Sequence, residues 1–310
     1  MKIKTVIDIG SNSIKMRSAK IYNGRLHILR DETEVVRLGR GMSKNGMLQP
    51  ENMRITCEAA SRMVKSARFP GKDYEIFIVG TQALRTAKNS GDFVRMIKDS
   101  TGLDVHIFSG EDEAKFSWLG AVDGFNFSGD VIMFDSGGGS TEFVSGCGNF
   151  VKLVKSVPVG AVTLSEKFFA DNSSPVKMSA CESALEFVKN LFIEHDILSF
   201  KTQDANLIGV GGGLVAMASV KFACENFLPS RLHGKILTQR DIMTQIKMYA
   251  ALNLIERQNI IGLPASRADV ILGSACIILA ALRLLEADSC IVSINGLRHG
   301  LLLRDNIISE

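Results

Sequence analysis

The chain of 310 residues has little proline, no closely spaced cysteines and no long apolar stretch. Its 6 prolines exclude proline-rich and collagen-like repeats. Its 6 cysteines include no CxxC metal or redox motif, so free thiols in a reducing compartment are expected. The longest apolar run, Ala275–Leu282, is far shorter than the ~20 residues that span a bilayer. The start, MKIKTVIDIG, breaks into Asp and Gly too early for a signal peptide. We therefore expect a cytoplasmic protein without membrane association.

The composition is that of a globular protein. Apolar residues make up 46% and charged residues 22%, and the length allows two domains. The net charge of +3 is too weak for nonspecific binding to nucleic acid, so no nucleic-acid partner is expected. The 28 glycines are the one excess that needs an explanation.

A weak internal repeat accounts for part of this glycine. Val6–Ser13 and Met133–Thr141 each run from a short apolar strand through Asp into small hydroxyl and Gly residues, with the two aspartates 127 residues apart. A second strand-to-glycine junction follows each Asp, at Gly80 and at Gly209. Repeats at matching distances predict two domains of related design.

Strands alternate with helices in both halves, which predicts an α/β fold. The expected domains are residues 1–125, joined by a C-terminal helix at about 298–310, and residues 126–297. The second is longer because helical patterns at Asp241–Glu256 and Ala268–Glu286 form an insertion. The two lobes should enclose a cleft where their glycine turns face each other.

The glycine turns are candidate phosphate sites. Residues without a Cβ let successive N–H groups converge on phosphate oxygens, although a flexible loop is the alternative. The candidate phosphate-binding residues of the two turns are Ser11, Asn12, Ser13, Gly137, Gly138, Gly139, Ser140 and Thr141.

Carboxylates beside these turns predict a cation. Asp8 and Asp135 each end an apolar strand, and two carboxylates among phosphate-binding amides would repel the substrate unless a hard cation lay between them. Mg²⁺ is therefore expected, with Mn²⁺ as a second possibility. Glu142 alternates with the apolar Phe143 and is a further candidate ligand, the alternative being an exposed strand position.

Hydrolysis also needs a residue that orients water and one that braces phosphate. The acids Glu111, Asp112 and Glu113 at a predicted helix start are candidates for the first task, but acids there also complement the helix dipole. Arg85 is the candidate for the second, with a solvated helix arginine as the alternative.

Several ordered motifs resemble the exopolyphosphatase/guanosine pentaphosphate phosphohydrolase (Ppx/GppA) family across nearly the whole chain. They are Val6–Ser13, Arg37–Gly41, Val79–Arg85, Ser109–Ala114, Asp135–Glu142, Pro158–Val162, Arg267–Val270 and Gly296–Leu301. The resemblance implies the actin/Hsp70/sugar-kinase superfold, with two ribonuclease-H-like lobes and an interlobe cleft that holds a metal-dependent site.

The resemblance also implies residue roles. Glu113 would activate water, Arg85 would clamp phosphate, and Asp135 and Glu142 would hold the metal. The turn Gly211–Gly213 lacks the hydroxyl usual in the family, which leaves nucleotide binding there open.

The function expected from the resemblance is removal of terminal orthophosphate from inorganic polyphosphate, with hydrolysis of guanosine pentaphosphate (pppGpp) as the alternative. A nucleotide-dependent kinase and a non-enzymatic sensor of polyphosphate or alarmone are the other classes that this superfold allows. A homodimer is also expected.

Overall fold

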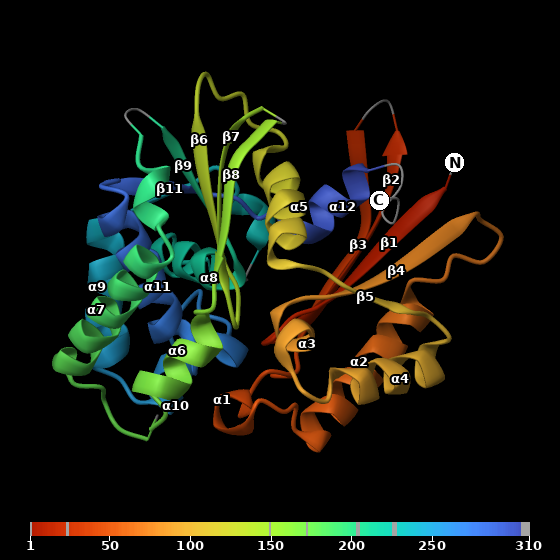
Figure 1. The fold of residues 1–310 in the computed structure, drawn as a ribbon, viewed down its shortest axis with the longest axis horizontal. Coiled ribbons are helices and arrows are strands. Elements are labelled where there is room, and N and C mark those ends of the chain that lie inside the picture. The colour runs from red at the N-terminus through yellow and green to blue at the C-terminus, as the bar shows by residue number, and fades with distance from the viewer. Residues whose placement is uncertain are drawn as a thin grey trace. The chain divides into compact units, whose positions relative to one another are not determined.

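The computed structural model describes residues 2–22, 25–148, 150–171, 173–202, 205–224 and 228–304 (Figure 1). The chain divides into two compact units. The N-terminal unit contains the residues up to Gly120 and the residues from Leu297 onward. The C-terminal unit is Ala121–Gly296.

The N-terminal unit contains a five-stranded sheet in the order β3-β2-β1-β4-β5. Strand β1 pairs antiparallel with β2, which pairs antiparallel with β3, whereas β4 and β5 run parallel to β1. The strands are β1 (Ile3–Ile9), β2 (Ser13–Tyr22), β3 (Arg25–Val35), β4 (Tyr74–Gly80) and β5 (Val105–Ile107).

Helices lie on both faces of this sheet. The helices of the unit are α1 (Met42–Asn45), α2 (Pro50–Ser66), α3 (Gln82–Thr86), α4 (Ser90–Thr101), α5 (Gly110–Val122) and α12 (Leu297–Leu303). Pro50 opens α2 at the first helical position, where its missing N–H costs nothing. The predicted C-terminal helix corresponds to α12, and residues 305–310 lie outside the described part of the chain.

Alternation along β1 decides which side chains meet which helices. Ile7 and Ile9 point into the core formed with α2 and α4. Val6 points to the opposite face, where it packs against Leu301 of α12. Because side chains alternate along a strand, Asp8 shares the face of Val6.

The C-terminal unit contains a six-stranded sheet in the order β10-β11-β9-β6-β7-β8. Its strands are β6 (Val131–Ser136), β7 (Thr141–Cys147), β8 (Phe150–Val157), β9 (Asn206–Val210), β10 (Ile236–Thr238) and β11 (Ser289–Val292). Its helices are α6 (Ala161–Phe168), α7 (Met178–Glu194), α8 (Gly212–Lys221), α9 (Gln239–Ala250), α10 (Leu254–Gln258) and α11 (Ile271–Leu284), with short 3₁₀ turns at Ile197–Phe200, Pro229–Arg231 and Ala265–Arg267.

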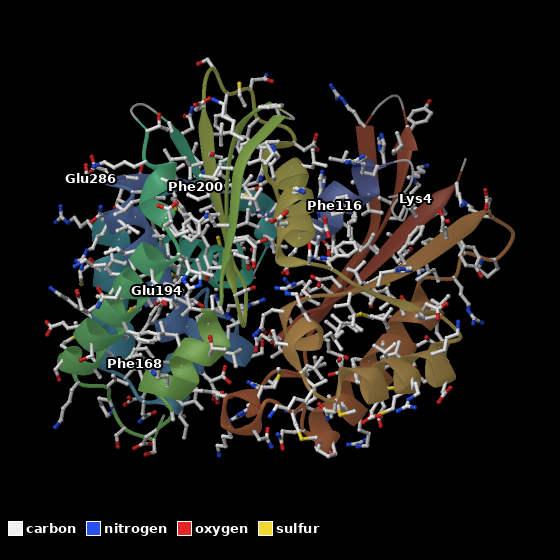
Figure 2. The ribbon with its side chains drawn as sticks, viewed as in Figure 1. Lys4, Phe116, Phe168, Glu194, Phe200 and Glu286 are labelled. Carbon is white, nitrogen blue, oxygen red and sulfur yellow. The ribbon has the colours of Figure 1, made fainter. Side chains whose placement is uncertain are left out.

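The core of this unit is built around α11 and a group of aromatic rings. Twelve of the fourteen residues of α11, Ile271–Leu282, are buried. Phe143 packs edge-on against Phe192 with ring centroids 5.0 Å apart, and Phe200, labelled in Figure 2, lies 5.9 Å from the same ring. The helix predicted over Asp241–Glu256 is two helices, because Asn253 caps the start of a new helix, α10.

In the described residues, no helix is long and apolar enough to cross a membrane.

The strand orders confirm the internal repeat. In each unit, a three-stranded antiparallel meander is continued by parallel strands, so that β1, β2, β3, β4 and β5 correspond to β6, β7, β8, β9 and β11. The first turns also match in detail, since Gly10 N donates to Ser13 O and Gly137 N donates to Ser140 O, each at 3.0 Å.

Candidate active site

The turn between β1 and β2 has its carbonyl groups engaged and its amide groups available. Ser11 O accepts from Gly39 N at 2.8 Å, and Asn12 O accepts from Val36 N at 3.1 Å and Arg37 N at 2.9 Å. Within the described residues, no group accepts from the N–H groups of Ser11 and Asn12. Buried backbone donors are nearly always paired, so these amides favour an external acceptor.

The turn between β6 and β7 has the same polarity. Gly137 O accepts from Ala161 N at 2.9 Å, and Gly138 O accepts from Val162 N at 2.8 Å. No acceptor in the described part of the chain meets the N–H groups of Gly138–Ser140. Both glycine turns that the repeat predicted therefore present backbone donors suited to an anion.

The second turn rests on the start of α6. A Cβ added to Gly160 would lie 2.4 Å from Gly138 C and Gly139 N, so only glycine allows this approach. Thr141 differs from its predicted role, because its hydroxyl donates to Val159 O at 2.6 Å and thus holds the turn to the segment before α6. The Thr141 side chain therefore supports the glycine turn, and its hydroxyl hydrogen is already donated within the protein.

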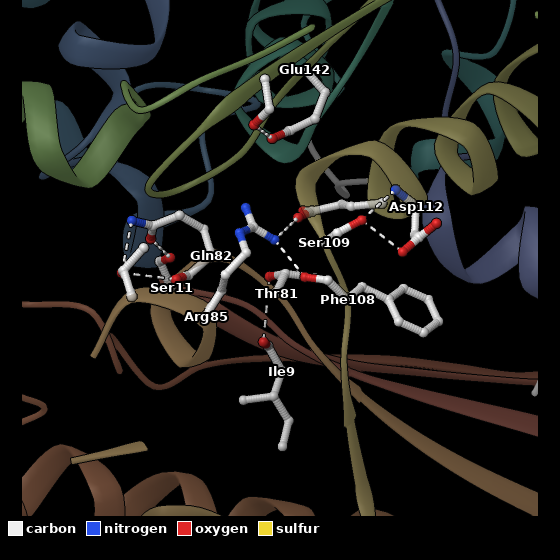
Figure 3. Close-up of polar contacts among 12 residues, drawn as sticks. Ile9, Ser11, Thr81, Gln82, Arg85, Phe108, Ser109, Asp112 and Glu142 are labelled. Atoms are coloured by element: carbon white, nitrogen blue, oxygen red, sulfur yellow. Dashed lines mark hydrogen bonds and ion pairs between the residues drawn. The ribbon is translucent and has the colours of Figure 1, made fainter. Parts of the chain in front are cut away.

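Asp135 and Glu142 are direct cross-strand partners in the β6–β7 ladder. Glu142 is only 1% exposed and accepts a hydrogen bond from Ser156 Oγ at 2.8 Å (Figure 3). Like charges directly opposite one another on a sheet are destabilising. Their pairing at the end of β6 therefore favours a bound cation, and it excludes the exposed strand position as the explanation of Glu142.

Asp8 occupies the equivalent place in the N-terminal unit, where it pairs across the ladder with Lys15. Asp8 is buried, and its Oδ1 atom has no hydrogen-bond partner. Burial raises the pKa of Asp8, while the charges of Lys15 and Arg298 act to lower it. An unsatisfied buried carboxylate oxygen is unfavourable in a ligand-free protein, which points to a ligand at this position.

A metal ion fits the carboxylates of the C-terminal unit. Mg²⁺ commonly takes only one or two protein carboxylates and completes its shell with water and phosphate oxygens. Asp135 and Glu142 supply two carboxylates on one face of the β6–β7 ladder. In the described residues, no three His, Cys, Asp or Glu side chains form a cluster that could hold a metal without other ligands.

Arg85 and Glu113 come together in the N-terminal unit, although 28 residues separate them in sequence (Figure 3). Arg85 Nη1 donates to Glu113 Oε2 at 3.1 Å and to Phe108 O at 2.8 Å. No described acceptor meets its Nε and Nη2 groups, which leaves them for a further anion. The predicted base and the predicted phosphate clamp therefore form one ion pair.

The neighbouring acids are engaged differently. Asp112 accepts from Ser109 Oγ at 2.6 Å at the start of α5, and Glu111 is largely exposed and pairs with Lys115. The Glu113 side chain is only 14% exposed. Of the three acids, Glu113 is thus the one held in a partly buried, charge-paired position.

Two residues near these turns were not predicted. Gln82 Oε1 accepts from Ser11 Oγ at 2.9 Å, which links the turn after β1 to the start of α3. Lys15 faces Asp8. A signal for Lys15 was present, because it follows Asp8 by seven residues, as Glu142 follows Asp135.

The third glycine turn, Gly211–Gly213, adjoins the end of β6 in its own unit. Gly211 has a φ of 118°, and a Cβ there would lie 2.4 Å from Ser136 O. A Cβ on Gly212 would collide with the guanidinium group of Arg267 at 2.2 Å.

A charged cluster ties α12 to the meander of the N-terminal unit. Asp31 accepts from Arg17 Nη2 and from Arg298 Nη1, both at 2.6 Å. Arg298 Nη1 also donates to Met16 O at 3.0 Å, next to Lys15. Arg17 is buried and contacts His299 Nδ1 at 3.1 Å. The cluster thereby fixes a positive charge on the Asp8 face of the sheet.

Comparisons with known proteins agree with this geometry. The model of the Ppx/GppA phosphatase family matches residues 18–307. A crystal structure of the Aquifex aeolicus member of the Ppx/GppA family is 30% identical, with a TM-score of 0.80 over 97% of this chain and 96% of that one. A crystal structure of an exopolyphosphatase from Cytophaga hutchinsonii is 25% identical, with a TM-score of 0.83 over 97% and 96%.

A curated relative is the guanosine-5'-triphosphate,3'-diphosphate pyrophosphatase of Vibrio atlanticus, which is 30% identical over 95% of this chain. The chain covers 57% of that protein and 46% of another curated relative, so it spans about half the length of such proteins. The structural similarity confirms the predicted α/β superfold.

Proposed function

Because the chain belongs to the Ppx/GppA phosphatase family, we propose that it is an Mg²⁺-dependent exopolyphosphatase that releases terminal orthophosphate from inorganic polyphosphate. The observation that carries this proposal is the paired polarity of the two glycine turns, whose carbonyl groups are engaged and whose amide groups are not. Such donors bind phosphate oxygens and stabilise the charge that develops during transfer.

Each of the acidic residues and Arg85 has a separate role in the proposed hydrolysis. Glu113 would orient a water molecule and accept its proton, because it is the partly buried acid of its helix start. Arg85 would hold Glu113 through Nη1 and use its remaining donors on phosphate. Asp135 and Glu142 would hold Mg²⁺ or Mn²⁺, which would neutralise phosphate charge when bound.

The alternative substrate is guanosine pentaphosphate, because the Vibrio atlanticus relative is named for that activity. The same turns and acids would serve either substrate. A cytoplasmic location and a homodimer stay predictions from the sequence.

The test is phosphate release from long-chain polyphosphate and from pppGpp, with Mg²⁺ and with chelator. Glu113→Gln should lower kcat by about 10²–10⁴-fold. The matched control is Glu111→Gln in the same helix turn, which should change kcat less than about twofold because that side chain is largely exposed. Equal rates for Glu113→Gln and the wild type would contradict the assigned mechanism. Phosphate release from pppGpp but not from polyphosphate would show that pppGpp, and not polyphosphate, is the substrate.

A further inference from the structure

Two segments beside the turn between β1 and β2 carry basic residues and no acidic ones. The first, residues 35–50, contains three Lys or Arg residues and no Asp or Glu. The second, residues 76–91, contains two Lys or Arg residues and again no Asp or Glu. Both belong to the N-terminal unit. Charge of one sign on neighbouring segments raises the local concentration of ligands of the opposite sign, so these segments favour an anionic partner.

Backbone hydrogen bonds hold the first segment to the turn. Arg37 N donates to Asn12 O at 2.9 Å, and Gly39 N donates to Ser11 O at 2.8 Å. The approach is close, because a Cβ added to Gly39 would lie 3.0 Å from the Cβ of Ser11. Arg40 comes next in the chain, and its N–H donates to Arg37 O at 3.0 Å. The segment therefore leads directly from the candidate phosphate-binding turn to α1.

The second segment is joined both to this turn and to the end of α1. Gln82 Oε1 accepts from Ser11 Oγ at 2.9 Å, and Lys88 N donates to Gly46 O at 2.9 Å. A Cβ added to Gly46 would lie 3.2 Å from Lys88 Cε and 3.7 Å from Lys88 Nζ. The ammonium group of Lys88 thus lies beside the end of α1, the helix that contains Lys44 (α1 in Figure 1).

Three cations of these segments, Arg40, Lys44 and Lys88, are exposed, and we call them the basic rim. None of the three has an ion-pair or hydrogen-bond partner for its side chain among the described residues. Other exposed cations of the unit are paired, as Lys98 is with Asp104 at 2.8 Å. The charges of the basic rim are therefore available to a ligand.

We propose that the basic rim binds the distal phosphate groups of a polyphosphate chain whose terminal phosphate lies at the turn between β1 and β2. This inference rests on the proposed function, because it takes inorganic polyphosphate as the substrate. A linear polyanion can contact several separate cations in succession, whereas one phosphate group cannot. The rim therefore adds affinity for long chains and little for short ones.

The composition of the two segments favours polyphosphate over single-stranded nucleic acid. Residues 36–50 and 81–91 contain no Phe, Tyr or Trp. Proteins that bind single-stranded nucleic acid stack its bases on aromatic side chains, in addition to neutralising its phosphates. Cations without aromatic neighbours match a ligand that consists of phosphate alone.

The experiment uses the triple variant Arg40→Gln, Lys44→Gln, Lys88→Gln of the full chain. Its KM for long-chain polyphosphate should rise at least about tenfold more than its KM for tripolyphosphate, because three exposed charge contacts are lost. The slope of log KM against log salt concentration for long chains should become shallower by about 2, as fewer counterions are released.

The matched control removes the same charge from cations of the same unit that are paired with acids. It is the triple variant Lys2→Gln, Arg95→Gln, Lys98→Gln. Its KM for long chains should change less than about twofold. Circular dichroism shows whether each variant is folded, and the substituted side chains of the rim are all exposed.

Binding of long-chain polyphosphate, measured by titration calorimetry in chelator, separates this inference from the proposed function. If the wild type hydrolyses polyphosphate and the rim variant shows the same KM for long chains, the rim inference is overturned and the proposed function stands. If the wild type releases no phosphate from polyphosphate, the proposed function fails and the Kd decides. An unchanged Kd in the rim variant overturns the inference, and a Kd weaker by at least about tenfold supports it. Equal affinity of the wild type for a single-stranded RNA of the same charge also overturns the assignment to polyphosphate.

Discussion

Gly160→Ala tests the phosphate-binding role proposed for the Gly137–Ser140 turn without removing any polar side chain. The backbone at Gly160 is extended, with φ −139°, so alanine meets no conformational penalty there. The obstacle is steric, because the new Cβ would lie 2.4 Å from two backbone atoms of Gly138 and Gly139. Ordinary contact begins at about 3.4 Å, so the turn must move by about 1 Å.

A shift of that size should misdirect the amide groups of Gly138–Ser140 and lower kcat/KM by about 10²-fold. Overpacking should also lower the free energy of unfolding by about 1–3 kcal/mol. The assays are phosphate release from polyphosphate with Mg²⁺ and urea unfolding followed by circular dichroism.

Gly91→Ala is the matched control, because nothing lies within 4 Å of a Cβ at that helical position. It should leave kcat/KM unchanged and raise the free energy of unfolding by about 0.4–1 kcal/mol. A folded Gly160→Ala protein with wild-type kcat/KM would refute the role given to the turn amides.

Three further substitutions examine the charged groups. Burial raises the pKa of Asp8, so its ionised form is unfavourable without ligand, and Asp8→Asn should raise the free energy of unfolding in chelator. That gain should be full above the raised pKa and vanish as the pH falls to about 3.9, the unfolded value; a gain independent of pH would contradict it. Glu142→Gln removes the like charge opposite Asp135, so it should stabilise the metal-free protein by about 0.2–1 kcal/mol and abolish the rise in Tm on adding Mg²⁺, as scanning calorimetry can measure. Arg85→Lys cannot hold Glu113 and phosphate with separate donors, so kcat/KM should fall at least about tenfold, and a fully active lysine variant would exclude the shared role.

Much of the fold could be predicted because its signals are local. A strand that ends in Asp and enters a small-residue turn occurs twice, and the structure shows matching strand orders and matching Gly10 and Gly137 turns. The helix start at Pro50 is also a local signal. The helix break at Asn253 was missed because the apolar spacing continues across it.

Long-range pairings could not be predicted in the same way. Nothing near Arg85 or Glu113 in sequence indicates that the two share a hydrogen bond, since β5 and the start of α5 bring them together. Thr141 follows a glycine turn as a phosphate ligand would, but its hydroxyl is used by Val159. The hydrogen-bond partner of such a side chain depends on which residue packs against it in the folded protein. One sequence alone does not reveal that tertiary contact.

The residues paired with Asp8 and Asp135 across their ladders distinguish the two units. The two units repeat one meander, yet the partner is a lysine opposite Asp8 and a glutamate opposite Asp135. The first pair is less favourable for a cation than the second, so the two turns differ in the charge beside them although they share one backbone arrangement. Exchanging Lys15 and Glu142 would place a carboxylate opposite Asp8 and an ammonium group opposite Asp135, and so exchange the charges beside the two turns.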